Sequence, residues 1–442
     1  MSVSNECREN SSSSKCTEVS QVKAWVTVSI AAFFFLYEFI QMDLFNVISQ
    51  YLMHDFAITA AQLGTMSTFY FVANVLFLFV SGVLLDRYSA RRIILLTLGL
   101  CIIATACFAL THNYYWACFF RFLTGVGGAF CFLSVVRLAT RWFPSSQMAF
   151  VTGVIVTIAF IGGIIAQTPL TILTQLFTWQ SVVLMDAVFG VAIWLLILWV
   201  VTDAPKGGEL QQQSNSVKPF NYITSYKRAF LNPQNWLAGC YTCLMNFPVG
   251  LLGGLWGVIY LIDVFDLTRM QASWVTTCMF IGTIFGCPIF GWVSDHLRSR
   301  CIPMLVGAVL SFVLVSILIF SDDLSYMNLL MLFVGLGFFT SSQVIGYPLV
   351  AESSPEDITA TSVSVVNICT QFGIMFSQPF FGFLLDKHAR VYLHHTQVAI
   401  HRYMAVDFQW AVLLFPLGML FSVLLVFLIK ETHCKQQVSA SS

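Results

Sequence analysis

The sequence predicts an all-α membrane protein with twelve transmembrane helices in two pseudo-symmetric six-helix bundles and with both termini in the cytoplasm. Three observations lead to this fold class. Of the 442 residues, 58% are hydrophobic and only 10% are charged, whereas about a quarter of residues are charged in soluble domains. Twelve apolar segments are long enough to cross a bilayer, and most Lys and Arg residues fall on one side of them.

Each span needs about 20 apolar residues, because lipid offers no hydrogen-bond partner to an open backbone. We expect the spans of the first bundle, within 24–201, at 24–47, 62–85, 93–110, 115–139, 148–173 and 180–201. Those of the second bundle, within 236–430, are expected at 236–262, 270–292, 301–320, 327–351, 358–385 and 408–429. The polar segments 1–23 and 431–442 are predicted cytoplasmic tails, and 202–235, rich in Gly, Gln and Ser, is a predicted cytoplasmic linker.

The distribution of basic residues predicts the orientation. With the amino terminus inside, sixteen of the 21 Lys and Arg residues lie in cytoplasmic loops or tails. Arg269, Lys387, Arg390 and Arg402 remain outside, and Arg121 lies within a span. Positively charged loops are retained in the cytoplasm, so both termini are expected there. No organelle sorting signal is recognisable, which favours a bacterial inner membrane.

A short charged motif occurs at matching places in the two bundles, at a constant offset of 209 residues. Each copy closes the second span of its half and has a glycine, an aspartate four residues later and then arginine. Its members are Gly82, Asp86, Arg87 and Arg91 in the first copy and Gly291, Asp295 and Arg300 in the second. The repeat predicts two parallel halves with a substrate site between them at mid-membrane.

We expect these residues to act as a conformational gate. Glycine lets a neighbouring helix approach, and aspartate can face a helix amino terminus, so the contacts would form when the cytoplasmic side closes. The alternative is that the charges only enforce the orientation. Gly382-x-x-x-Asp386 matches the same short pattern but is predicted to lie outside, so the pattern alone is a weak signal.

These motifs carry a resemblance to a known family. "GVLLDRYSARR", "GWVSDHLRSR" and "RFLTGVGGA" resemble the loop signatures and the fourth-helix motif of the major facilitator superfamily. The segments "FLYEF", "RWFP", "QTPL", "YPLVAE", "QPFFGFLLD" and "FLIKET" resemble a bacterial subgroup of poorly defined substrate. The resemblance implies a secondary transporter whose first, fourth, seventh and tenth helices line a cavity. The fifth span lacks the Gly-Pro pair of the drug/proton antiporters, which disfavours export.

Ionisable residues inside the spans are the candidate site residues, because each costs at least about 2.5–3.5 kcal/mol at the bilayer centre. Glu38 and Asp43 lie in the first span, Arg121 in the fourth and Asp186 in the sixth. We expect Glu38 to couple protons, with Arg121 at a compatible height, and the pair could also bind a zwitterion. The alternative is a permanent structural bridge from Arg121 to Glu38 or Asp43. Further candidate ligands for the substrate, all amides in the second half, are Asn246, Gln343 and Gln371.

The sequence also excludes several functions. The 21 basic and 21 acidic residues balance and form no basic run, so we expect no nucleic-acid partner. Neither a G-x-x-x-x-G-K-[ST] nor an H-E-x-x-H motif occurs, and we expect no cofactor, no metal and no enzyme activity. The prediction is a monomeric proton-coupled importer of a small polar nutrient, an amino acid or short peptide, in the lipid bilayer. The alternative is an exporter of drugs or metabolites.

Overall fold

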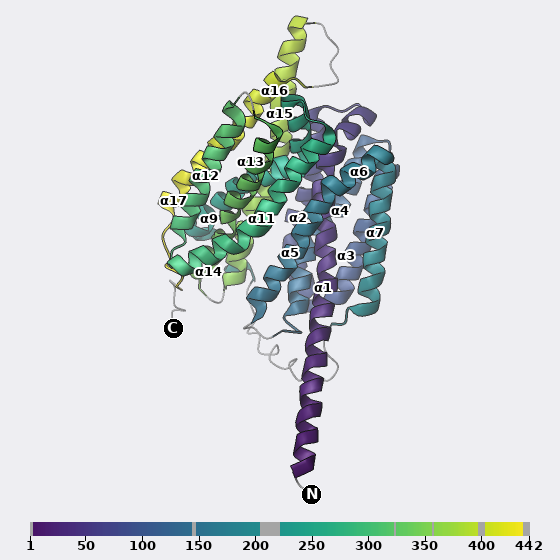
Figure 1. Cartoon of the computed structure of the whole chain (residues 1–442), viewed down its shortest axis with the longest axis vertical. Coiled ribbons are helices and arrows are strands. Elements are labelled where there is room, and N and C mark those ends of the chain that lie inside the picture. The colour runs from purple at the N-terminus through teal and green to yellow at the C-terminus, as the bar shows by residue number, and fades with distance from the viewer. Residues whose placement is uncertain are drawn as a thin grey trace.

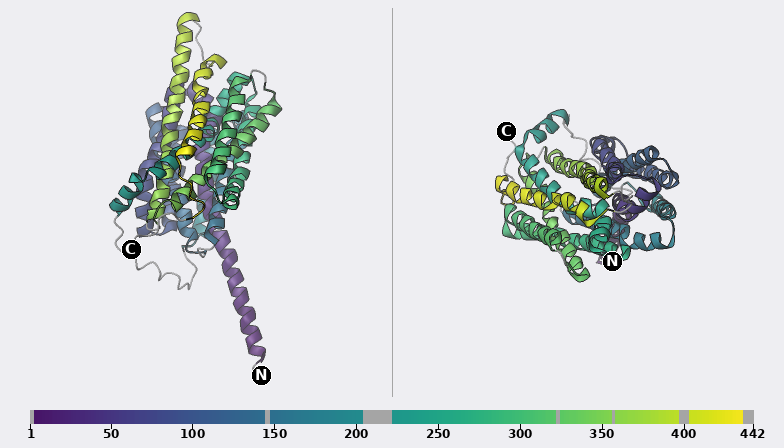
Figure 2. Two further views of the ribbon diagram at one scale, coloured as in Figure 1. Left: turned by 90° about the vertical axis from the view of Figure 1, so that its left-hand side faces the viewer. Right: turned by 90° about the horizontal axis from the view of Figure 1, so that it is seen from above.

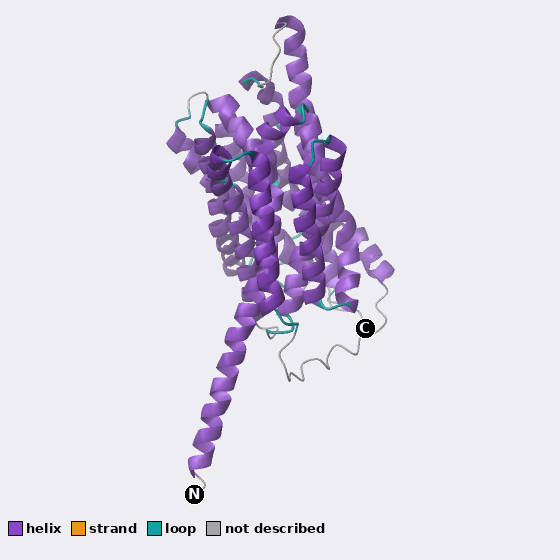
Figure 3. Ribbon diagram, turned by 90° about the vertical axis from the view of Figure 1, so that its right-hand side faces the viewer, coloured by secondary structure: helices purple, strands orange, loops and turns teal. Residues whose placement is uncertain are grey.

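The structure is a computed structural model and describes residues 3–143, 147–203, 222–321, 324–355, 358–396 and 403–435. Every regular element in these ranges is a helix (Figure 3). Eleven of the helices are long and apolar enough to cross a membrane, and the pair Pro233–Met245 and Val249–Phe265, bent by 44°, gives a twelfth span. The predicted all-α fold is therefore confirmed, while the orientation of the termini stays a prediction.

The first half contains six spans, which start where the sequence supplies amino-terminal caps. The side chains of Thr59, Ser89, Asn113 and Thr178 accept hydrogen bonds from the first turns of four of these helices. Pro169 lies where the fifth span breaks into two helices. The elements are α1 (Val3–Asp55), α2 (Ala60–Arg87), α3 (Ala90–Leu110), α4 (Tyr114–Ala139), α5 (Met148–Ala166), α6 (Thr168–Leu176) and α7 (Trp179–Val200).

The second half repeats the six spans with more interruptions. The seventh span consists of α9 (Pro233–Met245), the π-helix η3 (Val249–Trp256) and α10 (Gly257–Phe265). The tenth contains a short 3₁₀ segment, η4 (Ser341–Ile345), just before Gly346. The remaining elements are α8 (Tyr222–Leu231), α11 (Arg269–Leu297), α12 (Cys301–Phe320), α13 (Tyr326–Thr340), α14 (Gly346–Glu352), α15 (Thr359–Thr396), α16 (Ala405–Val412) and α17 (Leu414–Leu428).

Three segments that the sequence analysis assigns to tails or loops are helical. The first helix begins at Val3, so most of the predicted tail 1–23 continues the first span. Within the predicted linker 202–235, residues 222–231 form α8, and 204–221 lie outside the described residues. The helix α15 extends to Thr396, well beyond the predicted end of its span at residue 385.

The two halves lie side by side, with α1–α7 forming one bundle and α9–α17 the other (Figures 1 and 2). We call the face where α2 begins at Ala60, next to Asp386 of α15, the opposite face. The face where α3 and α12 begin is called the terminal face. Across the halves, α2 packs against α15 and α5 packs against α11. In Figure 1 the two bundles converge toward the opposite face, at the top.

The apolar core has a matching asymmetry. One cluster of buried residues joins the second half to the opposite-face part of the first half and includes Leu44, Leu63, Leu170 and Phe280. The terminal-face part of the first half has a separate core, which includes Ile94. In the described part of the chain, the large shared core therefore lies toward the opposite face, and a small cluster of Tyr70, Phe71 and Ile374 also joins the halves.

Candidate substrate and gating sites

Arg121 is the buried cation of the first half. Its Nη1 donates a hydrogen bond to the carbonyl oxygen of Gln41 at 2.7 Å, and its guanidinium lies 4.1 Å from the ring centroid of Phe45 and 4.8 Å from that of Tyr70. Only 2% of the residue is exposed, and Nε and Nη2 have no hydrogen-bond partner among the described residues. These two donors lie on one edge of the guanidinium, which is the geometry that binds a carboxylate through two parallel hydrogen bonds.

Glu38 lies on the other side of Tyr70 and is 1% exposed. The Tyr70 hydroxyl donates to its Oε2 at 3.2 Å, while Oε1 makes no hydrogen bond that satisfies normal geometry. Oε1 occupies space that α4 leaves open at Gly127, where an added Cβ would lie 2.2 Å from this oxygen. A proton on Oε1 would break no existing hydrogen bond, so the carboxyl group can be neutral or charged in this setting.

Gln41 links the polar groups around Arg121. Its side chain donates to the carboxylate of Asp186 on α7 and accepts from the Thr105 hydroxyl on α3 at 3.0 Å. Glu38 and Gln41 are three residues apart and therefore lie on one face of α1. In the first half only charged residues were predicted as site residues, so Gln41, Tyr70 and Thr105 were missed, although this spacing could have indicated Gln41.

Asp43 makes no hydrogen bond with Arg121 or with the described groups that surround Gln41. It lies five residues after Glu38, which turns it by about 140° around the helix axis. Its Oδ2 is buried, has no hydrogen bond and faces Gly163 of α5, while its Oδ1 faces Gly254 of η3. Among the described residues, no ion pair joins Arg121 to Glu38 or Asp43, so the predicted alternative of a permanent bridge is not formed in this structure.

A small cavity adjoins Arg121, with room for about one water molecule. Its lining includes Gln41, Phe45, Thr105 and Phe108, and all its lining residues belong to the first half. The sequence predicts the substrate site between the two halves, whereas this cavity lies inside one of them.

The amide candidates of the second half lie in interrupted or half-buried places. Asn246 ends α9, Gln343 lies in η4 and Gln371 lies in α15, and all three are half-buried. None of the hydrogen bonds found among the described residues joins them to Arg121, Glu38 or Asp43. The structure therefore brings Glu38 and Arg121 together around Tyr70, and their relation to these amides stays a prediction.

The predicted gate residues of the first half lie at the terminal face. Arg91 donates from Nη2 to the carbonyl oxygen of Leu198 at 2.6 Å, and its backbone N–H donates to Asp203 at 3.1 Å. Asp203 also accepts from the Ser89 hydroxyl and pairs with Arg141 at 3.5 Å. The hydrogen bonds found for Arg91 therefore stay within the first half. The side chains of Asp86 and Arg87 lie outside the described residues.

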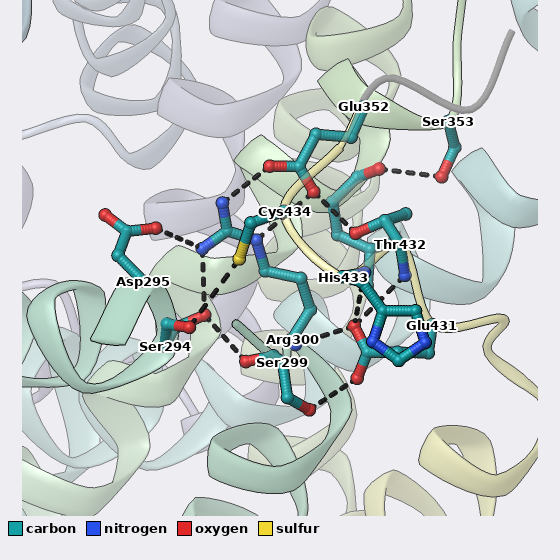
Figure 4. A network of polar contacts seen from close by, with 11 residues as sticks. Ser294, Asp295, Ser299, Arg300, Glu352, Ser353, Glu431, Thr432, His433 and Cys434 are labelled. Atoms are coloured by element: carbon teal, nitrogen blue, oxygen red, sulfur yellow. Dashed lines mark hydrogen bonds and ion pairs between the residues drawn. The ribbon is translucent and has the colours of Figure 1, made fainter. Parts of the chain in front are cut away.

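Arg300 is the centre of the equivalent network in the second half (Figure 4). Its guanidinium donates to Asp295 at 2.7 Å and to Glu352 at 2.5 Å. Glu431 accepts from the backbone N–H groups of Arg300 and Cys301 at 2.8 and 2.9 Å. Asp203 lies three residues after the end of α7, and Glu431 lies three residues after the end of α17. Each of these carboxylates therefore follows the last helix of its half and binds the start of the third span of that half. The sequence analysis missed Asp203, Glu352 and Glu431.

The gate glycines face open space. A Cβ atom added at Gly82 or Gly291 would have no other atom within 4 Å. On the opposite face the reverse holds, since a Cβ at Gly382 would lie 2.4 Å from the carbonyl oxygen of Ala60. Asp386 accepts hydrogen bonds from the N–H groups of Ala60 and Ala61 at 3.1 and 2.9 Å, and thereby caps α2 across the halves. The opposite face is closed in this structure.

Comparisons with known proteins agree with this architecture. A family model described as Major Facilitator Superfamily matches residues 28–378 and 239–441. The hexuronate transporter of Bacillus subtilis is 22% identical over 264 residues, which are 58% of this chain and 60% of that protein. The D-galactonate transporter of an Escherichia coli strain is 24% identical over 74% of this chain and 81% of its own length.

Solved structures share the fold. A bacterial homolog to the human lysosomal transporter Spinster, in an inward-facing and unoccupied conformation, superposes with a TM-score of 0.73 at 15% identity, over 93% of this chain and 97% of that chain. The nucleoside transporter NupG superposes with a TM-score of 0.71 at 12% identity, over 92% and 98% of the two chains.

Proposed function

The chain belongs to the major facilitator superfamily, and we propose that it imports a small carboxylate-bearing solute together with protons by alternating access. It is a multi-pass transporter and not an enzyme. The observation that carries the proposal is a buried guanidinium with two free donors, Arg121, next to a buried carboxyl group, Glu38, with which it forms no ion pair. A charge left without a partner at this depth is costly, and such residues line substrate and proton pathways.

The two groups suit different tasks. Arg121 presents Nε and Nη2 as a pair of parallel donors, which fits a carboxylate of the substrate. Glu38 has one oxygen bound by Tyr70 and one free, which fits the uptake and release of a proton. Because Tyr70 contacts both groups, movement of α2 would change both environments together.

Named relatives guide the choice of substrate. The names of three relatives refer to sugar acids. They are the hexuronate transporter, the D-galactonate transporter and the sialic acid transporter NanX of Escherichia coli. The amino acid or short peptide expected from the sequence also bears a carboxylate. We therefore place sugar acids first and amino acids second. With the predicted orientation, the closed opposite face is extracellular, which supports an assignment of this state to the cytoplasm-facing half of the transport cycle in a bacterial inner membrane.

Proteoliposome uptake tests the proposal. Labelled hexuronate, galactonate, sialic acid and an amino-acid panel are offered with and without an inward proton gradient. We expect one class to accumulate, Glu38→Gln to abolish the response to the gradient while exchange continues, and Arg121→Met to abolish binding of the solute. The exposed Arg298→Gln serves as the control. Gradient-driven accumulation that survives Glu38→Gln, or outward movement of every accepted solute, would contradict it.

A further inference from the structure

The seventh span contains a π-helix whose eight residues, Val249–Trp256, are all buried. Pro248 immediately precedes it and lacks a backbone N–H, so an α-helix cannot continue regularly through this point. The glycines at 250, 253 and 254 leave the surrounding carbonyl groups accessible from the side. π-helical turns are rare and occur mostly at functional sites.

Three amide side chains from three different spans bind the carbonyl oxygens of this π-helix. Asn46 of α1 donates from Nδ2 to Leu252 at 3.0 Å. Gln167, between α5 and α6, donates from Nε2 to Gly253 at 2.9 Å. Gln378 of α15 donates from Nε2 to Gly250 at 3.1 Å. We call Asn46, Gln167 and Gln378 the amide clasp.

The members from the first half are also bonded to each other and to further groups. Asn46 donates to the Oε1 of Gln167 at 3.0 Å and accepts from the N–H of Val258 at 3.0 Å. The hydroxyl of Thr276 on α11 donates to the same Oε1 at 2.9 Å. Asn46 and Gln167 therefore bind the second half through four hydrogen bonds, all of them buried.

The clasp lies where the two halves are in contact. Next to Gln167, the hydroxyl of Thr168 is 2.8 Å from that of Thr277, and Thr171 donates to Ser273 at 2.9 Å, so α6 is bonded to α11 over about one turn. Next to Gln378, a Cβ added at Gly64 of α2 would lie 2.7 Å from the carbonyl oxygen of Gln378. Rocking that separates the halves at the opposite face must pull the first-half amides off the π-helix.

We propose that the amide clasp holds the opposite face closed and must release from the π-helix carbonyl groups before that face can open. The amides bind carbonyl oxygens of η3. In a regular α-helix these oxygens would be more fully engaged in backbone hydrogen bonds. Gln378 keeps η3 attached to α15 within the second half, while Asn46 and Gln167 are the part that lets go. The assignment concerns the conformational cycle and does not depend on the substrate or on proton coupling.

Hydrogen–deuterium exchange of the full-length protein in lipid nanodiscs tests the assignment. Gln167→Met keeps the length of the side chain and removes both its donor and its acceptor. Loss of these bonds favours the open form, so we expect exchange about fivefold faster in residues 60–71 of α2 and 375–386 of α15. Asn46→Leu should act in the same segments.

A matched control separates this effect from a loss of stability. Asn235 is a fully buried amide that binds the carbonyl oxygen of Ala229 at 2.8 Å within the second half. Asn235→Leu should raise exchange near its own site and leave 60–71 unchanged. Unchanged exchange at 60–71 in both clasp variants, or a rise spread evenly over the chain, would overturn the assignment. If Gln167→Met does not fold, Asn46→Leu decides by the same criteria.

Discussion

At the opposite face polar groups of one half bind the other half, whereas at the terminal face the networks around Arg91 and Arg300 bind within their own halves. Asp386 caps α2 across the interface, and Arg269 donates to Gln50 of the first half at 2.6 Å. Asp203 and Glu431 instead hold together spans of a single half. Breaking a contact of the first kind should shift the balance between open and closed forms. Breaking one of the second kind should destabilise one half without opening the opposite face.

The largest effect is expected from Arg300→Met at the terminal face. Removal of the guanidinium leaves the half-buried Glu352 without its cation, and loss of one partner of such a pair costs about 3 kcal/mol of the free energy of unfolding. Chemical unfolding in detergent measures this loss. The control Arg298→Met changes an exposed neighbouring residue and should alter the free energy of unfolding by less than about 0.5 kcal/mol. An Arg300→Met variant as stable as wild type would contradict the structural role of this network.

Asp386→Ala is expected to shift the opposite face toward its open form by about 2 kcal/mol, because two backbone N–H groups of α2 lose their acceptor. Spin labels at positions 112 and 387, with reactive native cysteines replaced, report the opening as a longer distance. The control is Asp295→Ala, which changes the matching motif residue at the terminal face, where the side chain is 69% exposed. Equal distances in Asp386→Ala and wild type would show that this cap does not close the face.

A pair of glycine substitutions should differ by about 1–3 kcal/mol between the faces. Gly382→Ala places a methyl group against the backbone of Ala60 and should strain the closed opposite face. Gly82→Ala meets no atom within 4 Å and should leave this state unchanged. The same spin-label distances and the melting temperature measure both effects.

A bulkier residue at Gly82 tests whether the terminal face closes during transport. Gly82→Trp should keep the melting temperature of wild type, since the position faces open space. If α2 must approach the second half there, transport by this variant should fall at least about tenfold. Transport at the wild-type rate would mean that Gly82 takes no part in the gate.

The sequence was sufficient for the fold because membrane insertion depends on local properties that can be read directly. Apolar length alone locates the spans. A proline is also a local signal, and the 44° bend of the seventh span lies at Pro248, which has no backbone N–H to donate. The helical conformation of the tail from Val3 onward was not predicted, because polar composition says nothing about continuation of the helix beyond the bilayer.

The polar contacts were less predictable because they depend on which faces of distant helices meet. Glu352, Glu431, Gln167 and Gln378 all lie in segments that carry the family resemblance, yet no local signal gives their partners. The segment Gly382-x-x-x-Asp386, predicted to lie outside, served only to show that the short pattern is a weak signal. In the structure it packs against α2 and caps it. Asp43 and Glu38 also point in different directions around the axis of α1. The sequence analysis compared only their depth in the membrane, and depth does not reveal this difference.

The smallest effect is a pH dependence at Glu431 of the terminal face. Partial burial alone would raise the pKa of this carboxyl group, but hydrogen bonds from the Ser299 hydroxyl and from the N–H groups of Arg300 and Cys301 outweigh it and lower the pKa to about 2. In the unfolded chain the pKa is about 4.3. A group whose pKa is lower in the folded state contributes stability above the unfolded value and loses it as the pH falls toward the folded value. Because the side chain is partly exposed, the contribution is below about 1 kcal/mol.

The stability difference between wild type and Glu431→Gln should therefore be constant above about pH 5 and shrink between about pH 4.3 and the folded pKa. A difference that stays constant throughout this window would show that the charge of Glu431 does not stabilise the start of α12.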